Sequence, residues 1–252
     1  MTREWYLSGR STKNTVRKLV EKISEKNLDI NIILVKREKM KQFKDYITEE
    51  LSINTRKETK LLVDDVYSKY VDKYNKNSIE CVGWMDGTEN SQKRFQKIYE
   101  GGIGNDDSIL DVGCGVAHLH TYSKEQGWSG KYLGVDPNEK AIDLIDENIN
   151  AMCGTIDGLP EFMKYDWAIA NGVFNIGLRE EHSFSIIDNM ISRVNKGIIF
   201  NMLRSPYEDD KYEAYDPKRI QDKLSVIEHS KIEIVEDYME NNAEFTVYFY
   251  QI

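Results

Sequence analysis

The sequence has few prolines and cysteines, 4 and 3 among 252 residues. Cys81, Cys114 and Cys153 lack the spacing of metal ligands, which predicts free thiols in a reducing compartment and no bound metal. No apolar run approaches the roughly 20 residues that span a bilayer, and the first residues lack the apolar segment of a secretory signal. These absences predict a cytoplasmic protein with no membrane partner.

An excess of basic residues is also missing. Lys and Arg number 34 against 43 Asp and Glu, so the formal net charge is −9. The densest basic run, 36–41, is soon followed by Asp45, Glu49 and Glu50, which favours a solvated helix face over a nucleic-acid site. We therefore expect a small molecule as the partner and no nucleic acid. With 40% hydrophobic residues, a chain of this length can bury a substantial core.

What the sequence does contain is most informative at residues 109–119. An apolar strand carries Asp111 near its end, Gly113 and Gly115 form a tight turn, and a helix begins directly afterwards. Such a turn brings backbone amides close to a ligand. A second apolar run ends in Asp136. Two consecutive strands that end in acids beside a glycine turn predict a nucleoside cofactor across their carboxyl ends.

The same turn excludes two common cofactor motifs. A dinucleotide fingerprint needs a third glycine at position 118, which is His118, and a phosphate-binding loop needs a Gly-Lys-Ser/Thr sequence that does not follow. An acid at position 111 would repel a pyrophosphate and suits a cationic ligand group.

Residues 109–119 resemble the first motif of the class I, seven-stranded S-adenosylmethionine (SAM) methyltransferases. Residues 132–143 resemble the second motif of this family, and 165–175 the fourth. The resemblance covers residues 60–252 in order and spacing. Ala117 departs from the pattern, because many members carry a third glycine there, but alanine is small enough to be compatible with SAM binding.

The predicted fold is α/β, with a doubly wound, mostly parallel seven-stranded sheet and a C-terminal antiparallel hairpin. The predicted strands are 108–112, 131–135, 152–156, 166–170, 197–203, 231–236 and 244–250. No helix separates the last two, so they must be antiparallel neighbours. We expect this domain to span 58–252 and to follow a small α/β extension, 1–57. The extension could cap the substrate site, form a homodimer contact or buttress the core.

Apolar side chains at helical spacing predict helices between the strands. One stripe joins Ile142, Ile145 and Ile149, and another runs from Phe184 to Val194. A tyrosine stripe before the first strand predicts core packing, with hydroxyls lining the ligand cleft as the alternative.

The resemblance implies SAM as cofactor and S-adenosylhomocysteine (SAH) as product. Asp136 would bind the ribose hydroxyls, with a helix N-cap as the alternative role, and Asp111 the methionine amino group. Arg94 would lie near the SAM carboxylate or form a surface ion pair. The full predicted set is Trp84, Gln92, Arg94, Asp111, Gly113, Cys114, Gly115, Asp136, Pro137, Ile156, Asp157, Asn171, Gly172 and Phe174.

Methyl transfer is an in-line displacement, so alignment of the reactants can supply most of the acceleration. A base is needed only if the acceptor must lose a proton, and helix packing is the alternative role for the histidines after the glycine turn. The predicted catalytic residues are His118, Asn175, Asn201 and Arg204, followed by His120, His182 and Tyr207.

The sequence therefore predicts a SAM-dependent methyltransferase that acts on O or N of a small polar metabolite, such as a sugar or a nucleotide-linked intermediate. The alternative is a SAM-binding scaffold or regulatory protein without turnover.

Overall fold

The computed structural model describes residues 63, 67–175, 178–205, 212–240 and 243–252. All of them belong to one compact unit, Thr48–Ile252. The predicted N-terminal extension, its boundary at residue 57 and its proposed dimer contact lie outside the described residues.

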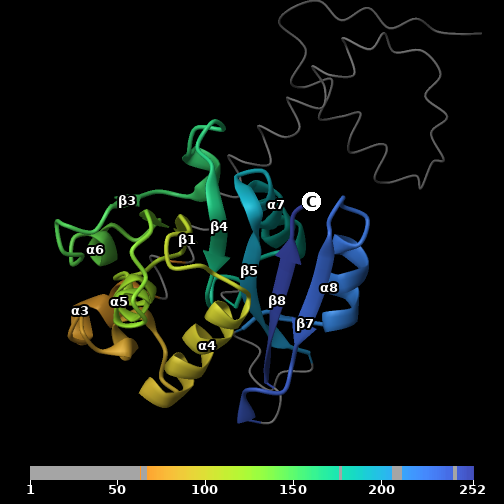
Figure 1. Cartoon of the computed structure of the whole chain (residues 1–252). Helices are drawn as coiled ribbons and strands as arrows, with labels where there is room; N and C mark the ends of the chain where they lie inside the picture. Colours follow the sequence, from red (N-terminus) through yellow and green to blue (C-terminus); the bar gives the residue numbers. More distant parts are fainter. Residues whose placement is uncertain (1–62, 64–66, 176–177, 206–211, 241–242) are drawn as a thin grey trace, which may run out of the picture. The chain divides into compact units, whose positions relative to one another are not determined.

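One sheet organises this unit (Figure 1), and its strand order is β3-β2-β1-β4-β5-β8-β7, with β6 pairing with β5 off this path. The strands are β1 (Ile109–Val112), β2 (Tyr132–Asp136), β3 (Ala151–Cys153), β4 (Tyr165–Ala170), β5 (Val194–Arg204), β6 (Ala214–Tyr215), β7 (Lys231–Val235) and β8 (Glu244–Tyr250). Strands β1 to β6 pair in parallel, whereas β8 is antiparallel to both β5 and β7. The predicted α/β class and the C-terminal hairpin are confirmed.

The chain order reverses at β1, which pairs with β2 on one side and with β4 on the other. In a doubly wound sheet, the crevice at the carboxyl ends of the strands on either side of such a reversal is the usual ligand site. The fold thus places the ends of β1, β2 and β4 around one point.

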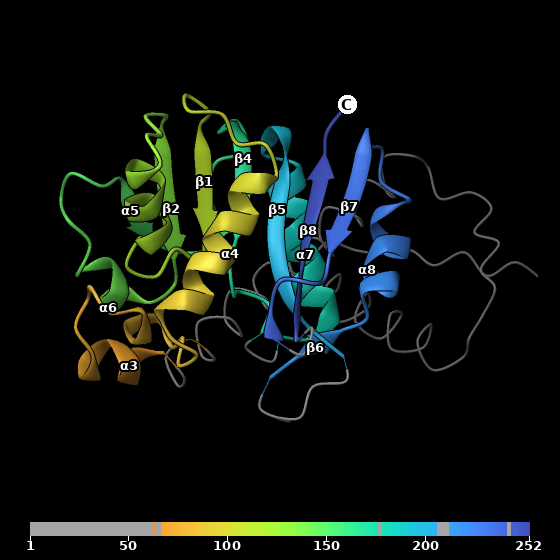
Figure 2. The same cartoon turned by 60° about the horizontal axis from the view of Figure 1, so that its bottom comes forward.

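Helices cover both faces of the sheet, and Figure 2 shows α4 and α7 on opposite sides of it. The helices are α3 (Ser68–Lys73), α4 (Thr88–Glu100), α5 (His118–Glu125), α6 (Glu139–Ile142), α7 (Glu180–Ile191) and α8 (Pro217–Leu224). Side chains alternate across β1, so Leu110 packs in the same core cluster as Ile187 of α7, and Ile109 in that of Phe95 of α4.

The predicted helix through Ile142, Ile145 and Ile149 is wrong in its length, because α6 ends at Ile142. The Asp146 carboxylate accepts a hydrogen bond from the backbone N–H of Asn148 at 3.0 Å, and this local bond competes with a helix. Ile145 and Ile149 still pack against the core as partly buried side chains. The apolar stripe therefore predicted the burial of these side chains correctly, but it did not predict the backbone conformation.

Candidate functional site

A cavity lies at the carboxyl ends of β1, β2, β3 and β4. Asp111, Asp136 and Asn171 reach it from the ends of three of these strands or from the turns that follow them. Of the residues predicted to hold the cofactor, the lining contains Trp84, Asp111, Gly113, Cys114, Gly115, Asp136, Pro137, Ile156, Asp157, Asn171 and Gly172. The structure thus brings most of the predicted set to one place.

The turn after β1 requires glycine at two positions. Gly113 has φ 71° and Gly115 has φ 55°, both in the left-handed region. A β-carbon at Gly113 would lie 2.5 Å from Val173 Cγ2, and one at Gly115 would lie 2.6 Å from Val82 Cγ1. Side chains at these positions would be strained and would also fill space beside the cavity.

Ala117 shares this strained backbone without being glycine. It is the N-cap of α5, its φ is 63°, and its side chain is fully buried. A left-handed conformation costs a residue with a β-carbon about 1–2 kcal/mol. Ala117 therefore replaces the third glycine of the motif but keeps the left-handed backbone conformation that a glycine would adopt.

We expect Ala117→Val to lower the free energy of unfolding by roughly 2 kcal/mol or more, since a branched side chain would overpack a buried left-handed site. Ala117→Gly is the control. It relieves about 1–2 kcal/mol of strain but loses a buried methyl worth about 0.8 kcal/mol and adds disorder to the unfolded chain, so its stability should stay close to the original. Urea unfolding measures both, and a valine variant as stable as the glycine variant would contradict the strain at Ala117.

The Asp136 carboxylate is held by two backbone amides. Its Oδ2 accepts from Gly115 N at 2.9 Å and its Oδ1 from Asn138 N at 2.8 Å. The N-cap of α6 is Asn138, so Asp136 itself does not occupy that position. Burial raises the pKa of Asp136, and the two amide bonds oppose this rise. Both oxygens keep further lone pairs that can accept from a ligand.

The Asp111 carboxylate is 2% exposed and accepts a hydrogen bond from the Tyr132 hydroxyl at 2.7 Å. Burial raises its pKa to about 7, and the nearby Asp136 adds to this shift, whereas the Tyr132 bond opposes it. Asp111 is therefore an acid that a neighbouring cation would ionise near neutral pH.

Three residues of the predicted cofactor set lie elsewhere. Phe174 is fully buried in the core, with its ring edge-on to Phe200 at 5.4 Å. Gln92 is exposed on α4 and does not line the cavity. Arg94 also lies outside the lining, because Glu244 and Asp86 bind its guanidinium at 2.9 and 2.8 Å. These positions do not support direct contact of the three side chains with a ligand in this cavity.

Among the predicted catalytic residues that the structure describes, only His118 belongs to the cavity lining. Its Nε2 lies 2.9 Å from the Lys76 carbonyl oxygen, so Nε2 carries the hydrogen, and the buried Nδ1 has no partner among the described residues. Burial lowers the pKa of His118, which keeps the ring neutral at physiological pH. His120 instead packs against Tyr132, with ring centroids 4.9 Å apart.

The other catalytic candidates have structural partners. Asn175 Oδ1 accepts from Leu203 N at 3.1 Å, and Arg204 forms an ion pair with Glu236 at 3.0 Å. Asn201 is 3% exposed and lies within a polar network. His182 is buried in α7, outside the cavity lining, and Tyr207 lies outside the described residues.

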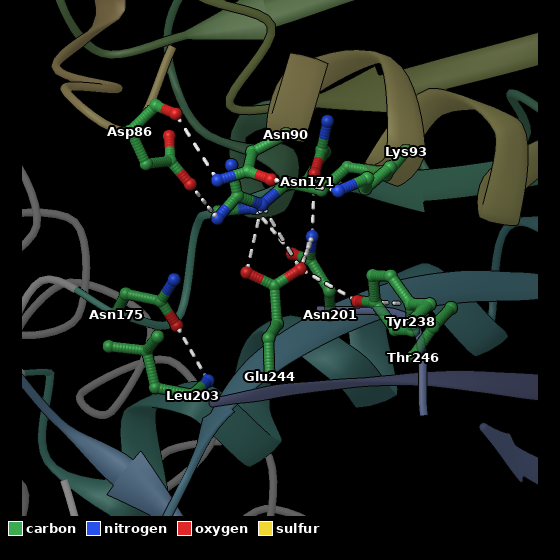
Figure 3. A network of polar contacts seen from close by, with 12 residues as sticks. Asp86, Asn90, Lys93, Asn171, Asn175, Asn201, Leu203, Tyr238, Glu244 and Thr246 are labelled. Atoms are coloured by element: carbon green, nitrogen blue, oxygen red, sulfur yellow. Dashed lines mark hydrogen bonds and ion pairs between the residues drawn. The ribbon is translucent and has the colours of Figure 1, made fainter. Parts of the chain in front are cut away.

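That polar network, shown in Figure 3, surrounds the buried carboxylate of Glu244, which is 1% exposed. Glu244 accepts from Arg94 Nε at 2.9 Å, from Asn201 Nδ2 at 2.9 Å and from the Tyr238 hydroxyl at 2.7 Å. It thereby joins α4 to the ends of β5 and β8. Sequence reasoning missed Glu244, although a charged residue at the start of an otherwise apolar strand could have indicated a buried ion pair.

Tyr67 is a second addition to the site. Its ring lines the cavity and lies 2.8 Å from the position that a β-carbon at Gly83 would take. Burial strongly raises the pKa of its hydroxyl, and Tyr212 and Asp136 raise it further, so the hydroxyl stays protonated. Tyr67 belongs to the tyrosine stripe before β1, and it both packs against the core, as predicted, and lines the cavity, as the alternative prediction had it.

The charge of the lining is acidic. Asp111, Asp136 and Asp157 line the cavity, and no lysine or arginine does so within the described part of the chain. Nor do the described residues contain a cluster of His, Cys, Asp and Glu suited to a metal ion. None of the helices in the described ranges combines the length and apolar character needed to cross a bilayer.

No family model matches the chain. It is 26% identical over 158 residues to the Mycobacterium tuberculosis protein named "Putative methyltransferase Rv1506c". The match covers 56% of this chain and 90% of that protein.

Several solved structures share the fold. The N-methyltransferase NodS from Bradyrhizobium japonicum, crystallised with SAH, has a TM-score of 0.56 and 12% identity over 74% of this chain and 98% of its own. A SAM-dependent methyltransferase from Archaeoglobus fulgidus has a TM-score of 0.53 and 14% identity over 66% and 96%. One from Clostridium acetobutylicum has a TM-score of 0.53 and 14% identity over 73% and 98%. Together with the strand order and the glycine turn, these likenesses show that the chain has the fold of the class I, SAM-dependent methyltransferases.

Proposed function

We propose that this protein is a SAM-dependent methyltransferase. The observation that carries the proposal is the convergence of Asp111 and Asp136, from the ends of two adjacent parallel strands, on one cavity beside the glycine turn. An acidic cavity suits a ligand with a positive sulfonium and an ammonium group. A β-carbon at Gly113 or Gly115 would collide with Val173 or Val82, so close packing as well as backbone conformation requires glycine in this turn.

The residues present fit the parts of SAM. The Asp136 carboxylate would accept hydrogen bonds from the ribose hydroxyls, and Asp111 would ionise to bind the amino group. Ile156 and Asp157, in the 3-10 turn Ile156–Gly158 after β3, would hold the adenine through packing and through its exocyclic amine.

When bound, SAM supplies a methyl group on a positively charged sulfur. The contribution of this chain is to bind and orient the ligand and to exclude water from the buried acids. Correct alignment of two bound reactants can contribute about 7–11 kcal/mol to the acceleration of such a displacement. No residue is assigned as a base, since the one histidine in the described lining is turned toward the Lys76 carbonyl.

We further propose that the acceptor is a small polar metabolite, methylated at oxygen or nitrogen in the cytoplasm. The formal net charge of −9 supports a small molecule over a nucleic acid. NodS, named as an N-methyltransferase, is an example of this fold acting on nitrogen.

Two measurements test the proposal. Calorimetric titration with SAH should give one binding site per chain with a micromolar dissociation constant, and absence of heat would count against SAM binding. A screen of small hydroxyl and amino compounds for SAH release from SAM then tests turnover. Binding without release from any acceptor would favour the non-catalytic scaffold instead.

A further inference from the structure

The amide orientations of Asn171 and Asn201, at the carboxyl ends of β4 and β5, are fixed by their partners. Gly172 N can only donate, so the atom 2.6 Å away must be Asn201 Oδ1. Asn201 Nδ2 therefore faces the other way, where it donates to Glu244 Oε1 at 2.9 Å and to Asn171 at 2.7 Å. The Asn171 atom that receives this bond must be its oxygen. This assignment follows from the donors and acceptors alone.

The consequence is a defined polarity at the cavity wall. Because the Asn171 oxygen faces Asn201, the amide nitrogen of Asn171 faces the other way and is available to a ligand. Figure 3 shows this nitrogen on the side of Asn171 away from Asn201 and Glu244. Asn171 lines the cavity, and its Nδ2 has no hydrogen bond within the described residues. It can donate to a ligand but not accept from one.

A second N–H group lies beside Gly172, the residue that follows Asn171. Trp84 also lines the cavity, and its Nε1 is 3.1 Å from the position that a β-carbon at Gly172 would take. Gly172 has φ 77°, so glycine is favoured there, and the missing side chain leaves room for the indole to pack against this residue. The described residues offer no acceptor to Trp84 Nε1, while Arg94 stacks on the ring at 4.6 Å from its centroid and holds it in place.

Two neutral donors in an otherwise acidic cavity select a weakly charged anion. A phosphate dianion would be repelled by Asp111, Asp136 and Asp157 more strongly than a single carboxylate would. Asp111 ends β1, the strand next to β4, and suits an ammonium group. Asp111 and the two donors therefore match the two charged groups of an α-amino carboxylate. Its ammonium would lie at Asp111 and its carboxylate at the donors.

We propose that Asn171 Nδ2 and Trp84 Nε1 together bind a ligand carboxylate at the β4 end of the cavity. This inference rests on the proposed function, because the carboxylate belongs either to the methionine part of the cofactor or to the methyl acceptor. Glu244 and Asn201 are positioning residues in this scheme, since they act only by setting the orientation of Asn171.

The indole N–H signal of Trp84 in a ¹H–¹⁵N spectrum, assigned with Trp84→Phe, reports on this site directly. If the carboxylate is that of the cofactor, SAH should move the proton signal downfield, and 5′-methylthioadenosine, which lacks the amino-acid end, should not. If it is that of the acceptor, acetate should move the signal in the SAH-saturated protein, and acetamide should not. If the position of the signal changes in neither experiment, the proposal is overturned.

Affinity gives the second readout. Asn171→Asp keeps the oxygen that accepts from Asn201 but replaces the donor by an acceptor, so the network and the fold should persist. For a cofactor carboxylate, the variant should bind SAH about tenfold more weakly or worse, because a hydrogen bond to a charged group is lost. Its affinity for 5′-methylthioadenosine should stay within about twofold, given that this ligand lacks the carboxylate. Trp84→Phe should act in the same direction.

Asn195→Asp is the matched control, since it adds the same charge at an exposed position outside the cavity and should leave both affinities unchanged. For an acceptor carboxylate, Asn171→Asp should instead abolish the acetate effect and leave SAH binding intact. If the unmodified protein binds neither nucleoside, the proposed function itself fails. If it binds both, and Asn171→Asp changes neither SAH affinity nor the acetate effect, only this inference fails.

Discussion

Replacing Asp136 by alanine is expected to weaken SAH binding by about 100-fold or more. The ribose offers two hydroxyls to one buried carboxylate, and each hydrogen bond to a charged group contributes about 1.5–3 kcal/mol. Loss of about 2.7 kcal/mol already corresponds to a factor of 100 in the dissociation constant. Calorimetric titration of the unmodified protein and of Asp136→Ala measures the difference.

Asp136 also binds the amides of Gly115 and Asn138, so the variant must be shown to be folded. Circular dichroism and thermal unfolding provide that check. Asp143→Ala is the control for charge, because Asp143 is exposed at the end of α6 and does not line the cavity. An Asp136→Ala protein that is folded and binds SAH within about threefold of the original, well under the effect of one such hydrogen bond, would contradict this role.

The second large effect concerns pH. We expect SAH to bind about tenfold more tightly at pH 8 than at pH 6, because the ammonium group requires an ionised Asp111 whose pKa is about 7 in the empty cavity. The contribution of Asp111 to the stability of the empty protein changes with pH in the opposite direction. A folded pKa raised above 3.8 means that the stability contributed by Asp111 is fully present below that value and is lost as pH rises through about 7.

Other titratable groups line the same cavity as Asp111, and their effects must be separated from its own. Burial raises the pKa of Asp136, whereas it lowers that of His118. Asp111→Asn is the informative variant, since it keeps the shape and cannot ionise. It should bind SAH weakly at every pH and lose the change between pH 6 and 8. Titrations at both pH values decide this, and an unchanged pH dependence in Asp111→Asn would assign the effect to another residue.

The part of the site that could be predicted from the sequence is the part held by local backbone geometry. Asp111, Gly113 and Gly115 lie within five consecutive residues whose strand, turn and helix order determines where they point. Asp136 follows from the same reasoning applied to the next strand. Because parallel strands end at the same edge of a sheet, the convergence of these residues follows once the strands are identified.

Contacts between distant segments could not be predicted in this way. Arg94 and Glu244 are 150 positions apart, and nothing near either residue in the sequence indicates the other. The prediction that Arg94 contacts SAM was therefore made without knowledge of its ion pair with Glu244, which determines the environment of Arg94. Asn201 was a predicted catalytic residue, but its side chain lies in the same network and contacts Asn171 and Gly172, both of which line the cavity.

The length of α6 shows a different limit. The spacing of Ile142, Ile145 and Ile149 satisfies a helix pattern, yet the chain turns after Ile142 because Asp146 offers the backbone another hydrogen bond. An apolar stripe reports which side chains are buried. It does not exclude a series of turns that buries the same side chains.

A crystal structure of the protein with SAH would show where the ligand binds. We expect one nucleoside in the cavity, with its ribose hydroxyls on the Asp136 carboxylate and its amino group beside Asp111. A nucleoside bound elsewhere, or one in this cavity with its ribose away from Asp136, would contradict the claim that the acids ending β1 and β2 hold opposite parts of a single ligand.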